Sequence, residues 1–232
     1  MNLVSRMSDS ERLGSFIVVA GIDGAGKTSV STSLARRLGG PTVWLSHRGI
    51  PELEPRFLTE HLARLASAIW EKPGDPQDLL GHRHFLHLLA GWYCALDLLV
   101  IRPNLAAGRD IVCDGWIYKT VARAASRDDI SPALKAESFA GLSEPDLVIL
   151  LDVDPKTCAT RKETITDAEA GRHDGWGGDV LQSFVQHQSM VQRQLRTDLE
   201  RCKALKIVNG NLPFEDVVTE CERALEDVLS AP

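Results

Sequence analysis

The chain has 232 residues, of which 44% are hydrophobic and 25% are charged, and its formal net charge at pH 7 is −6. These fractions are typical of a globular protein, and the acidic balance argues against a surface that binds nucleic acid through its phosphates. The five cysteines are scattered and odd in number, and no apolar run reaches the ~18 residues of a membrane span. We therefore expect reduced thiols, no membrane insertion and a cytoplasmic location.

The hydrophobic pattern predicts strands that alternate with helices. Residues 1–14 are polar and of mixed charge, and we interpret them as a short leader. Short apolar runs predict five strands, at 16–20, 41–46, 110–114, 145–153 and 205–210. Longer stretches predict helices at 27–40, 56–72, 78–101, 116–126, 155–164, 179–205 and 213–229, with the breaker KPGDP between the second and the third. We expect an α/β fold, a doubly wound parallel sheet with helices on both faces, in a single domain over 15–232.

The first strand is followed by a glycine-rich phosphate-binding sequence. GIDGAGKT, residues 21–28, fits G-x-x-x-x-G-K-[ST] between a predicted strand and a predicted helix, which is the context that this motif requires. Glycines let successive backbone N–H groups face an anion, Lys27 can reach the β- and γ-phosphates, and the Thr28 hydroxyl can bind Mg²⁺. We expect ATP and Mg²⁺ as cofactors. The residues expected to bind them are Gly21, Asp23, Gly24, Ala25, Gly26, Lys27, Thr28 and Ser29.

Two further predicted strands end in carboxylates. Asp114 follows the apolar run IVC, and Asp152 lies near the end of the 145–153 strand. A carboxylate beside a phosphate-binding loop can accept the proton of an attacking hydroxyl or hold Mg²⁺ through water. We expect Asp114 to be catalytic and, with Thr28, a metal ligand. For Asp152, a purely structural role is as strongly favoured as a role in holding Mg²⁺. The chain has no Asn-Lys-x-Asp motif, which favours a small kinase over a GTPase.

Four segments resemble the thymidylate kinase family of P-loop kinases. They are FIVVAGIDGAGKTS, IRPNLAAGRDIVCD, PDLVILLDVDPKTCATR and IVNGNLPFEDVVTEC, and they occur in the family's order over residues 15–229. The resemblance implies a P-loop kinase fold, the use of ATP and Mg²⁺, and transfer of the γ-phosphoryl group to a nucleoside monophosphate. It also implies that Asp23, the acid in the phosphate-binding loop, meets a sugar hydroxyl of the acceptor, although a turn-forming role is the alternative.

The chain departs from the family around the acceptor. The family's third strand ends in Asp-Arg, and that arginine helps to hold the acceptor's phosphate, whereas here Gly115 follows Asp114. Tyr93 stands where an arginine of the family reaches the base, and SHRGIPE offers Arg48 without the family's Glu-Pro-Gly. Loss of a fork-shaped phosphate donor predicts an acceptor other than ordinary thymidine monophosphate. The residues expected to contact the substrate are Arg48, His84, Trp92, Tyr93, Gly115 and Trp116.

A glycine-rich segment, about 161–178, is expected to act as a lid over the site. Its tip, GRHDGWGGD, has four glycines, which supply the flexibility that a lid requires. Because the phosphate-binding loop has no arginine of its own, the charge of the transferred phosphoryl group must be met from elsewhere. We expect Arg161 and Arg172, which border this segment, to be catalytic; the alternative is that they are solvated surface cations.

Three histidines, His82, His84 and His87, are close together on the predicted 78–101 helix. Their spacing does not match a zinc pattern, and no cysteine or acid joins them closely. We therefore expect them on the helix surface or in the lining of the acceptor pocket. Trp92 and Tyr93 could stack on a planar acceptor, although core packing is expected for at least one of them.

Together these features predict a thymidylate kinase-like phosphotransferase that moves the γ-phosphoryl group of MgATP to a nucleotide or nucleoside-like small molecule. Two alternatives stay open: a kinase of a non-nucleotide metabolite or natural product, and an ATP-binding regulatory module without turnover. We expect ATP and a small-molecule acceptor as partners, no nucleic acid and no membrane, and a homodimer is a possible assembly. Whether a hydroxyl or a phosphate attacks stays open as well.

Overall fold

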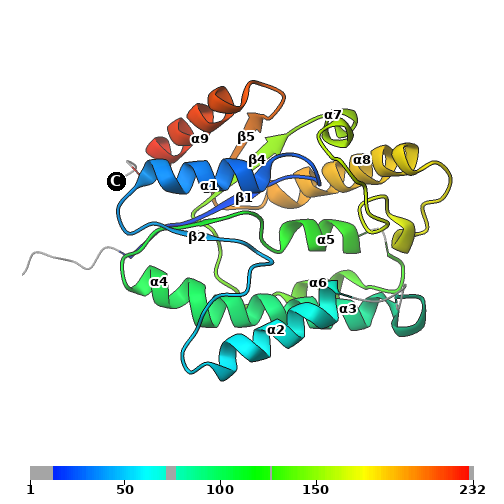
Figure 1. Ribbon diagram of the computed structural model, residues 1–232, viewed down its shortest axis with the longest axis horizontal. Helices are drawn as coiled ribbons and strands as arrows, with labels where there is room; N and C mark the ends of the chain where they lie inside the picture. The colour runs from blue at the N-terminus through cyan, green and yellow to red at the C-terminus, as the bar shows by residue number, and fades with distance from the viewer. Residues whose placement is uncertain (1–12, 72–76, 126, 230–232) are drawn as a thin grey trace, which may run out of the picture.

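Five parallel strands form the centre of the part of the chain that the structure describes (Figure 1). The structure is a computed structural model, and it describes residues 13–71, 77–125 and 127–229. The strands are β1 (Phe16–Ala20), β2 (Val43–Leu45), β3 (Ile111–Cys113), β4 (Leu147–Asp152) and β5 (Leu205–Asn209), in the order β2-β3-β1-β4-β5. Each lies within the range predicted for it, so the parallel α/β sheet is confirmed. Most of the predicted leader and the breaker KPGDP fall outside the described residues.

The central strands are apolar because both of their faces are covered. Every residue of β1 and most residues of β4 are buried. Val18 of β1 is in register with Cys113 of β3 on one side and with Val148 of β4 on the other. This register brings the carboxyl ends of β1 and β3 to the same edge of the sheet, so Gly21 and Asp114, which follow those ends, lie at that edge. Parallel α/β sheets bind their ligands there.

Helices cover both faces of the sheet. In Figure 1, α1 (Lys27–Leu38) and α9 (Phe214–Leu229) lie on one side of it, and α2 (Phe57–Trp70), α3 (Gln77–Leu96) and α4 (Arg102–Ala106) lie on the other. The other helices described are α5 (Tyr118–Ala124), α6 (Pro132–Ser138), α7 (Pro155–Thr160), the 3₁₀ turn η2 (Arg172–Asp174) and α8 (Val180–Leu199). Arg37 links α1 to α9 through ion pairs with Glu215 and Glu222.

The long helix predicted at 78–101 is interrupted in the structure. Gly81 has a φ of +72°, far from helical values, and a π-helical turn, η1 (Asp97–Ile101), joins α3 to α4. Asp97 is fully buried in this turn and accepts a 2.8 Å hydrogen bond from Nε of Arg102. The buried carboxylate therefore has a cationic partner one turn away, which its burial in an apolar helix requires.

The same helical stretch corrects the expectation that nothing in the chain is long and apolar enough to cross a membrane. By length and composition, Leu79–Ala106 meets that criterion. However, 44% of its most apolar window is buried inside the protein. Trp92, Leu96 and Ile101 on this stretch are fully buried, so its apolar character serves the core of the fold.

Capping residues explain where α6 (Pro132–Ser138) and α8 (Val180–Leu199) begin. α6 is not among the predicted helices. Its start is marked by Ser131, which accepts a hydrogen bond from the N–H of Leu134, and by Pro132 in the first turn. α8 begins close to its predicted start because Asp179 caps it, accepting a 2.9 Å hydrogen bond from the N–H of Gln182. α7 and α8 end several residues before their predicted ends, at Thr160 and Leu199, which hydrophobic periodicity alone does not mark.

The 161–178 segment is held against α5 and α8 by one buried carboxylate, Asp174, whose side chain is only 2% exposed. Its Oδ2 accepts a 2.8 Å hydrogen bond from Arg123 and lies 3.0 Å from Nε2 of His187, and its Oδ1 accepts hydrogen bonds from Nε (2.8 Å) and Nη2 of Arg127. Burial alone would raise the pKa of Asp174. The His187 ring and the two arginines outweigh burial, however, and hold the pKa far below its usual value.

Asp174→Asn should therefore destabilise the fold by roughly 3–5 kcal/mol, because two largely buried guanidinium groups lose their carboxylate. The pKa of Asp174 in the folded protein lies below its unfolded value of about 3.9. Its stabilisation is thus fully present above that pH and is lost as the pH falls below it. Urea denaturation of parent and variant should show a difference in unfolding free energy that shrinks toward acid pH.

The exposed carboxylate Asp167, in the same segment, provides the control. Asp167→Asn should change the unfolding free energy by less than about 0.5 kcal/mol at any of these pH values. A difference between parent and Asp174→Asn that stays constant with pH would contradict the role of the ionised carboxylate.

Candidate active site

The phosphate-binding loop lies between the carboxyl end of β1 and the first turn of α1. Gly24 and Gly26 have φ values of +81° and +92°, a left-handed conformation that residues with side chains rarely adopt. A Cβ on Gly24 would also lie 2.6 Å from the carbonyl oxygen of Cys158, so a side chain has no room there. The loop leads into α1, whose N-terminal dipole favours an anion at the same place. This geometry fits the phosphates of a nucleoside triphosphate.

Lys27, the first residue of α1, turns back toward the loop. Its Nζ donates a 2.8 Å hydrogen bond to the carbonyl oxygen of Ile22. Burial lowers the pKa of Lys27 more than the nearby Asp23 raises it, and Arg48 adds to the lowering. Two cations close together in a partly buried place favour an anionic ligand, and a triphosphate is a ligand of that kind.

Asp114 lies directly after β3 and joins three elements at this edge of the sheet. Its Oδ2 accepts a 2.9 Å hydrogen bond from the Thr28 hydroxyl. Its Oδ1 accepts a 2.8 Å hydrogen bond from the backbone N–H of His47 and lies 2.9 Å from Nδ1 of the same residue. Burial would raise the pKa of Asp114, but the contacts with His47 and Thr28 lower it below its usual value. The carboxylate is therefore ionised at neutral pH.

The donor set at this point suits Mg²⁺. A hydroxyl oxygen of Thr28 and an ionised carboxylate of Asp114 lie side by side, and Mg²⁺ prefers oxygen ligands. Across residues 13–71, 77–125 and 127–229, no group of three or more His, Cys, Asp and Glu side chains could hold a metal ion. The pair of Thr28 and Asp114 fits the usual Mg²⁺ arrangement, in which one or two protein ligands are completed by substrate phosphates and water.

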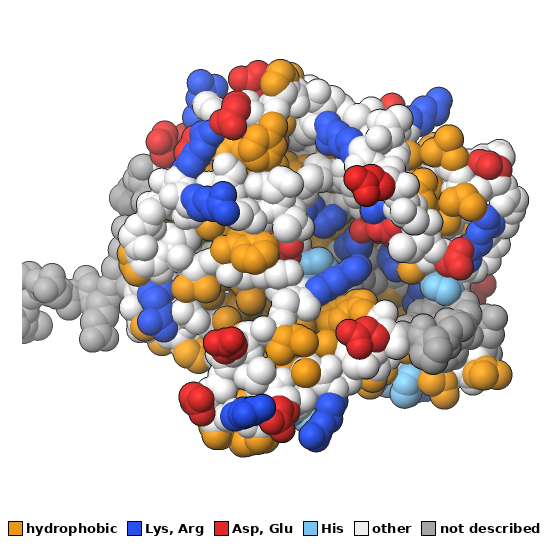
Figure 2. All heavy atoms as spheres, viewed as in Figure 1, with side chains coloured by type: hydrophobic (Ala, Val, Ile, Leu, Met, Phe, Trp, Pro, Cys, Tyr) orange, Lys and Arg blue, Asp and Glu red, His pale blue; other side chains and the backbone are white. Residues whose placement is uncertain are grey.

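Two cavities lie beside these groups and share one wall. The first, here called the phosphate cavity, is lined by the phosphate-binding loop together with Asp114 and Arg161. The second, here called the inner cavity, is lined by residues of α3 and α5 together with Trp70 of α2 and residues of the loops after β1, β2 and β3. In Figure 2 the viewed face is hollowed near its centre, and Lys and Arg side chains gather around the hollow. The residues that line both cavities are Lys27, His47, Arg48 and Lys119.

The inner cavity combines aromatic walls with positive charge. Its aromatic residues include Tyr93 and Trp116, whose rings meet edge to face with centroids 5.1 Å apart, and Trp70 and Phe85. The cations that line it are Lys27, Arg48, Lys119, Arg123 and Arg127. No acidic residue is found among the described residues that line it. Such a cavity suits a planar ligand that carries electron-rich or anionic groups.

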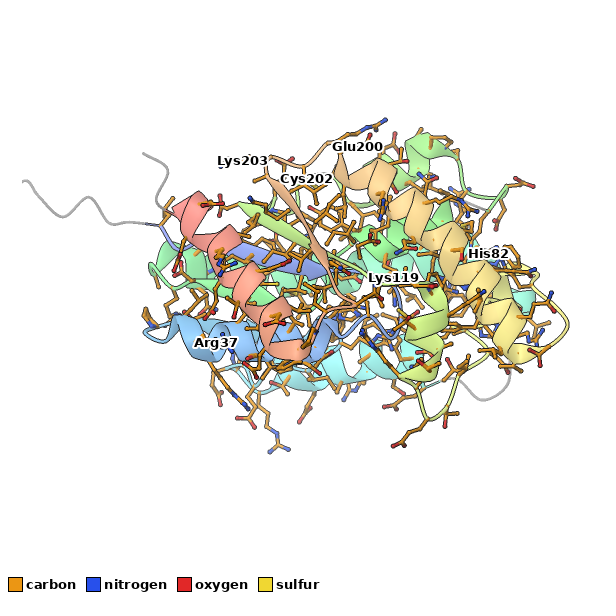
Figure 3. All side chains as sticks on the ribbon, turned by 90° about the horizontal axis from the view of Figure 1, so that it is seen from above. Arg37, His82, Lys119, Glu200, Cys202 and Lys203 are labelled. Carbon is orange, nitrogen blue, oxygen red and sulfur yellow. The ribbon has the colours of Figure 1, made fainter. Side chains whose placement is uncertain are left out.

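Lys119 of α5 forms an ion pair with Asp23 of the phosphate-binding loop, and Figure 3 shows Lys119 near the middle of the molecule. Gln188 of α8 also holds Asp23, because its side-chain oxygen accepts a 3.1 Å hydrogen bond from the N–H of Asp23. Burial lowers the pKa of Lys119 to about 8, against the raising effect of Asp23. Asp23, which we expect to meet the acceptor's sugar, is thus engaged by two side chains in this structure.

Gly115 leaves room for His47 rather than for an arginine. Its φ is +112°, which favours glycine, and a Cβ there would lie 3.4 Å from Nδ1 of His47. The ring that Asp114 holds therefore lies in van der Waals contact with this position. An arginine at position 115 would strain the backbone, so any cation for the acceptor's phosphate must come from another position. Arg48 and Lys119, at the shared wall, are cations in a suitable place.

Two of the predicted substrate residues line neither cavity. Trp92 is fully buried, packs edge to face on Trp70, and donates a 2.8 Å hydrogen bond to the carbonyl oxygen of His47. It therefore supports the wall from behind. His84 is exposed on α3, where its ring contacts that of Phe85. Of the neighbouring pair that could stack on an acceptor, the structure brings Tyr93 to the inner cavity and leaves Trp92 in the core.

The two arginines predicted to be catalytic lie in different surroundings. Arg161 lines the phosphate cavity, and its Nη2 donates a 2.9 Å hydrogen bond to the carbonyl oxygen of Gly210. Arg172 instead donates to the carbonyl oxygens of Trp176 (3.2 Å) and Gly178 (2.7 Å) within its own segment, and it lines neither cavity. The structure thus brings Arg161, but not Arg172, to the phosphate cavity. Asp152, paired with Arg196, lines neither cavity either.

Several residues of the site carry no motif that a reading of the sequence singles out. Lys119 and Arg123 are four residues apart on α5, which places their side chains on one face of the helix, and Arg127, beyond the end of α5, lines the inner cavity with them. This spacing is visible in the sequence, but cations at helical spacing more often form a solvated face. His47 and Gln188 give no comparable signal, because their roles depend on contacts with distant residues.

Comparison with known proteins extends the resemblance over nearly the whole chain. A family model described as thymidylate kinase matches residues 19–221. The chain is 28% identical to a thymidylate kinase of Haemophilus ducreyi, over 97% of this chain and 99% of the relative. It is also 28% identical to a thymidylate kinase of Danio rerio, over 94% and 93%. Identity to a thymidylate kinase of Jannaschia sp. is 33%, over 63% of this chain and 67% of the relative.

Lys27→Ala should abolish ATP turnover and leave the fold intact, because the charged end of Lys27 lines the phosphate cavity rather than the core. ADP release measures the turnover, and circular dichroism with thermal unfolding checks the fold. Arg36→Ala, at an exposed position of the same helix, is the matched control and should keep the parental rate. A Lys27→Ala rate within about tenfold of the parent, only about 1.4 kcal/mol in barrier, would rule out the phosphate role.

Asp114→Asn keeps the shape of the side chain but removes its charge. We expect kcat to fall by about 10²–10⁴, with a much smaller change in the affinity for ATP, since an amide can neither take a proton nor neutralise a metal ion. Steady-state kinetics gives the first quantity and titration calorimetry gives the second. Should ATP binding fail while kcat survives, Asp114 serves only the donor and the assignment is wrong.

Proposed function

The chain belongs to the thymidylate kinase family, and we propose that it transfers the γ-phosphoryl group of MgATP to a nucleoside-like acceptor bound in the inner cavity. As a member of this family it is an ATP-dependent phosphotransferase. The observation that carries the proposal is the wall of Lys27, His47, Arg48 and Lys119 that the two cavities share. A donor in one cavity and an acceptor in the other would meet at that wall, with cations around the transferred group.

On the donor side, residues 21–29 would hold the triphosphate, with Lys27 on the β- and γ-phosphates. Thr28 and Asp114 would hold Mg²⁺, which supplies positive charge to those phosphates when it is bound. Arg161 would add a cation from the 161–178 segment. Both carboxylate oxygens of Asp114 already accept from Thr28 or His47, which supports a role beside the metal more than a role as proton acceptor.

On the acceptor side, a planar ring would lie against Tyr93 and Trp116, with the reacting end of the molecule at the shared wall. Aromatic faces hold a planar base by stacking and by excluding water. Asp23 would accept a hydrogen bond from the acceptor's sugar, as the family resemblance implies, beside its ion pair with Lys119. The inner cavity thus offers a separate contact for the ring, for the sugar and for the reacting group.

We further propose that thymidine monophosphate is a poor acceptor. Where the family has its phosphate-binding arginine, this chain has Gly115, and Tyr93 replaces the arginine that reaches the base. Lys119 lies close by, but Asp23 already neutralises its charge. A bidentate arginine contact contributes roughly 1.5–3 kcal/mol, so its loss predicts about a ten- to hundredfold lower kcat/KM.

A specific observation favours a second candidate function, that of an ordinary thymidylate kinase. Arg48 and Lys119 both line both cavities, and the guanidinium of Arg48 lies 5.8 Å from the centre of the Trp70 ring. These two cations could hold the acceptor's phosphate without an arginine at position 115. The relatives named above, all thymidylate kinases, support this candidate as well.

The proposal includes a cytoplasmic homodimer that binds neither nucleic acid nor membrane. Large apolar side chains are exposed on neighbouring helical elements, and a second copy of the chain could cover them. They are Phe57 on α2, Leu79 and Leu80 on α3, and Leu98 on η1. The net charge of −6 supports the absence of a nucleic-acid partner.

Steady-state kinetics with MgATP and a panel of acceptors tests the proposed function. The panel holds thymidine monophosphate, thymidine, further nucleosides and nucleoside monophosphates, and non-nucleotide alcohols, with ADP release and product mass as readouts. We expect transfer to at least one nucleoside-like acceptor, and a kcat/KM for thymidine monophosphate below about 10⁴ M⁻¹s⁻¹. A higher value would establish the second candidate instead, and Arg48→Ala and Lys119→Ala should then each lower it. Transfer to a non-nucleotide alone would replace the nucleoside proposal.

A further inference from the structure

Arg123 lies one helical turn beyond Lys119 on the same face of α5. Lys119 lines both cavities, whereas Arg123 lines the inner cavity and not the phosphate cavity. Since a helix rises about 1.5 Å per residue, Arg123 lies about 6 Å further along α5 than Lys119. An acceptor whose reacting end lies at the shared wall would therefore reach Arg123 with its opposite end. The Arg123 side chain remains 21% exposed, so part of it is open to a ligand.

The 161–178 segment is shaped to hold Arg123. Asp174, which lines neither cavity, accepts a 2.8 Å hydrogen bond from Nη2 of Arg123. Its turn is closed by the backbone, because the N–H of Asp174 donates a 2.8 Å hydrogen bond to the carbonyl oxygen of Gly171. Gly171 has a φ of +73°, and a Cβ there would lie 2.6 Å from Cγ of His187. Only glycine lets the turn come this close to α8 and carry the carboxylate to Arg123.

We propose that Arg123 is a specificity-determining residue that contacts an oxygen on the far edge of the acceptor's ring, and that Asp174 positions Arg123 for this contact. The inference rests on the proposed function, since it requires a nucleoside-like acceptor in the inner cavity. A guanidinium group held by a carboxylate keeps a fixed plane, and a fixed plane lets its N–H donors distinguish one ring edge from another. The ligand class is a planar ring with a carbonyl oxygen, such as a pyrimidine base.

Steady-state kinetics of Arg123→Gln, Asp174→Asn and the double variant tests this inference, with the panel acceptor that has the highest kcat/KM for the parent. Each single variant should raise the acceptor KM about ten- to hundredfold, and the KM for ATP should change less than about threefold. Because Asp174 acts through Arg123, the double variant should raise the acceptor KM no further than Arg123→Gln alone. Asp167→Asn, the exposed control, should leave both values unchanged.

A second comparison addresses the ring oxygen. The parent should use thymidine at least about tenfold better than the matching pyrimidin-2-one nucleoside, which lacks the 4-oxygen, and Arg123→Gln should lose that preference. An Arg123→Gln protein that keeps the preference would overturn the ring contact.

The other outcomes separate the two parts of the inference from the proposed function. Additive losses in the double variant, or a fall in kcat with every substrate, would show that Asp174 is only structural. An unchanged acceptor KM in Arg123→Gln, in which Asp174 keeps its contacts with Arg127 and His187, would overturn the role of Arg123 even if Asp174→Asn does not fold. No transfer to any nucleoside or nucleotide would mean that the proposed function itself is wrong, and the inference would fall with it.

Discussion

The hydrogen bonds of Asp114 are the constraint on which the rest of the site depends. One carboxylate joins the start of α1, through Thr28, to the end of β2, through His47, and its own place after β3 adds the third element. Because contacts on both oxygens keep it ionised, it fixes the ring of His47 and the first turn of α1 together. The glycine at position 115 follows from its backbone, whose φ of +112° favours a residue without a side chain, and the His47 ring lies at van der Waals distance from that position.

A chain with a net charge of −6 nevertheless surrounds its inner cavity with cations. The balancing carboxylates lie behind the cavity wall: Asp23 pairs with Lys119, and Asp174 pairs with Arg123 and Arg127. The field inside the cavity therefore has the opposite sign to the protein as a whole, and it depends on where a few buried pairs lie rather than on composition. The 161–178 segment contributes to this field through the carboxylate of Asp174, which holds two of the cations that line the cavity.

The fold and the phosphate-binding loop could be predicted because their signals are local. The apolar run FIVVA predicts a buried strand, and the glycine pattern after it predicts a tight loop. The loop requires a glycine at position 24 because a side chain has no room there. His47 could not be found in this way, because it reaches Asp114 only through the β2–β3 register that pairs Leu45 with Cys113. Trp92 and Tyr93 are adjacent, but neighbouring helix positions point about 100° apart, so only one of them faces the cavity.

The wall that the two cavities share has an evolutionary consequence. With the donor and the acceptor bound as we propose, a substitution at Lys27, His47, Arg48 or Lys119 would alter the surroundings of both ligands. Arg123, Arg127 and Tyr93 line only the inner cavity, so a substitution at these positions would leave the lining of the phosphate cavity unchanged. Under the proposed function, acceptor preference could therefore diverge at these inner-cavity positions without a change in the lining of the phosphate cavity.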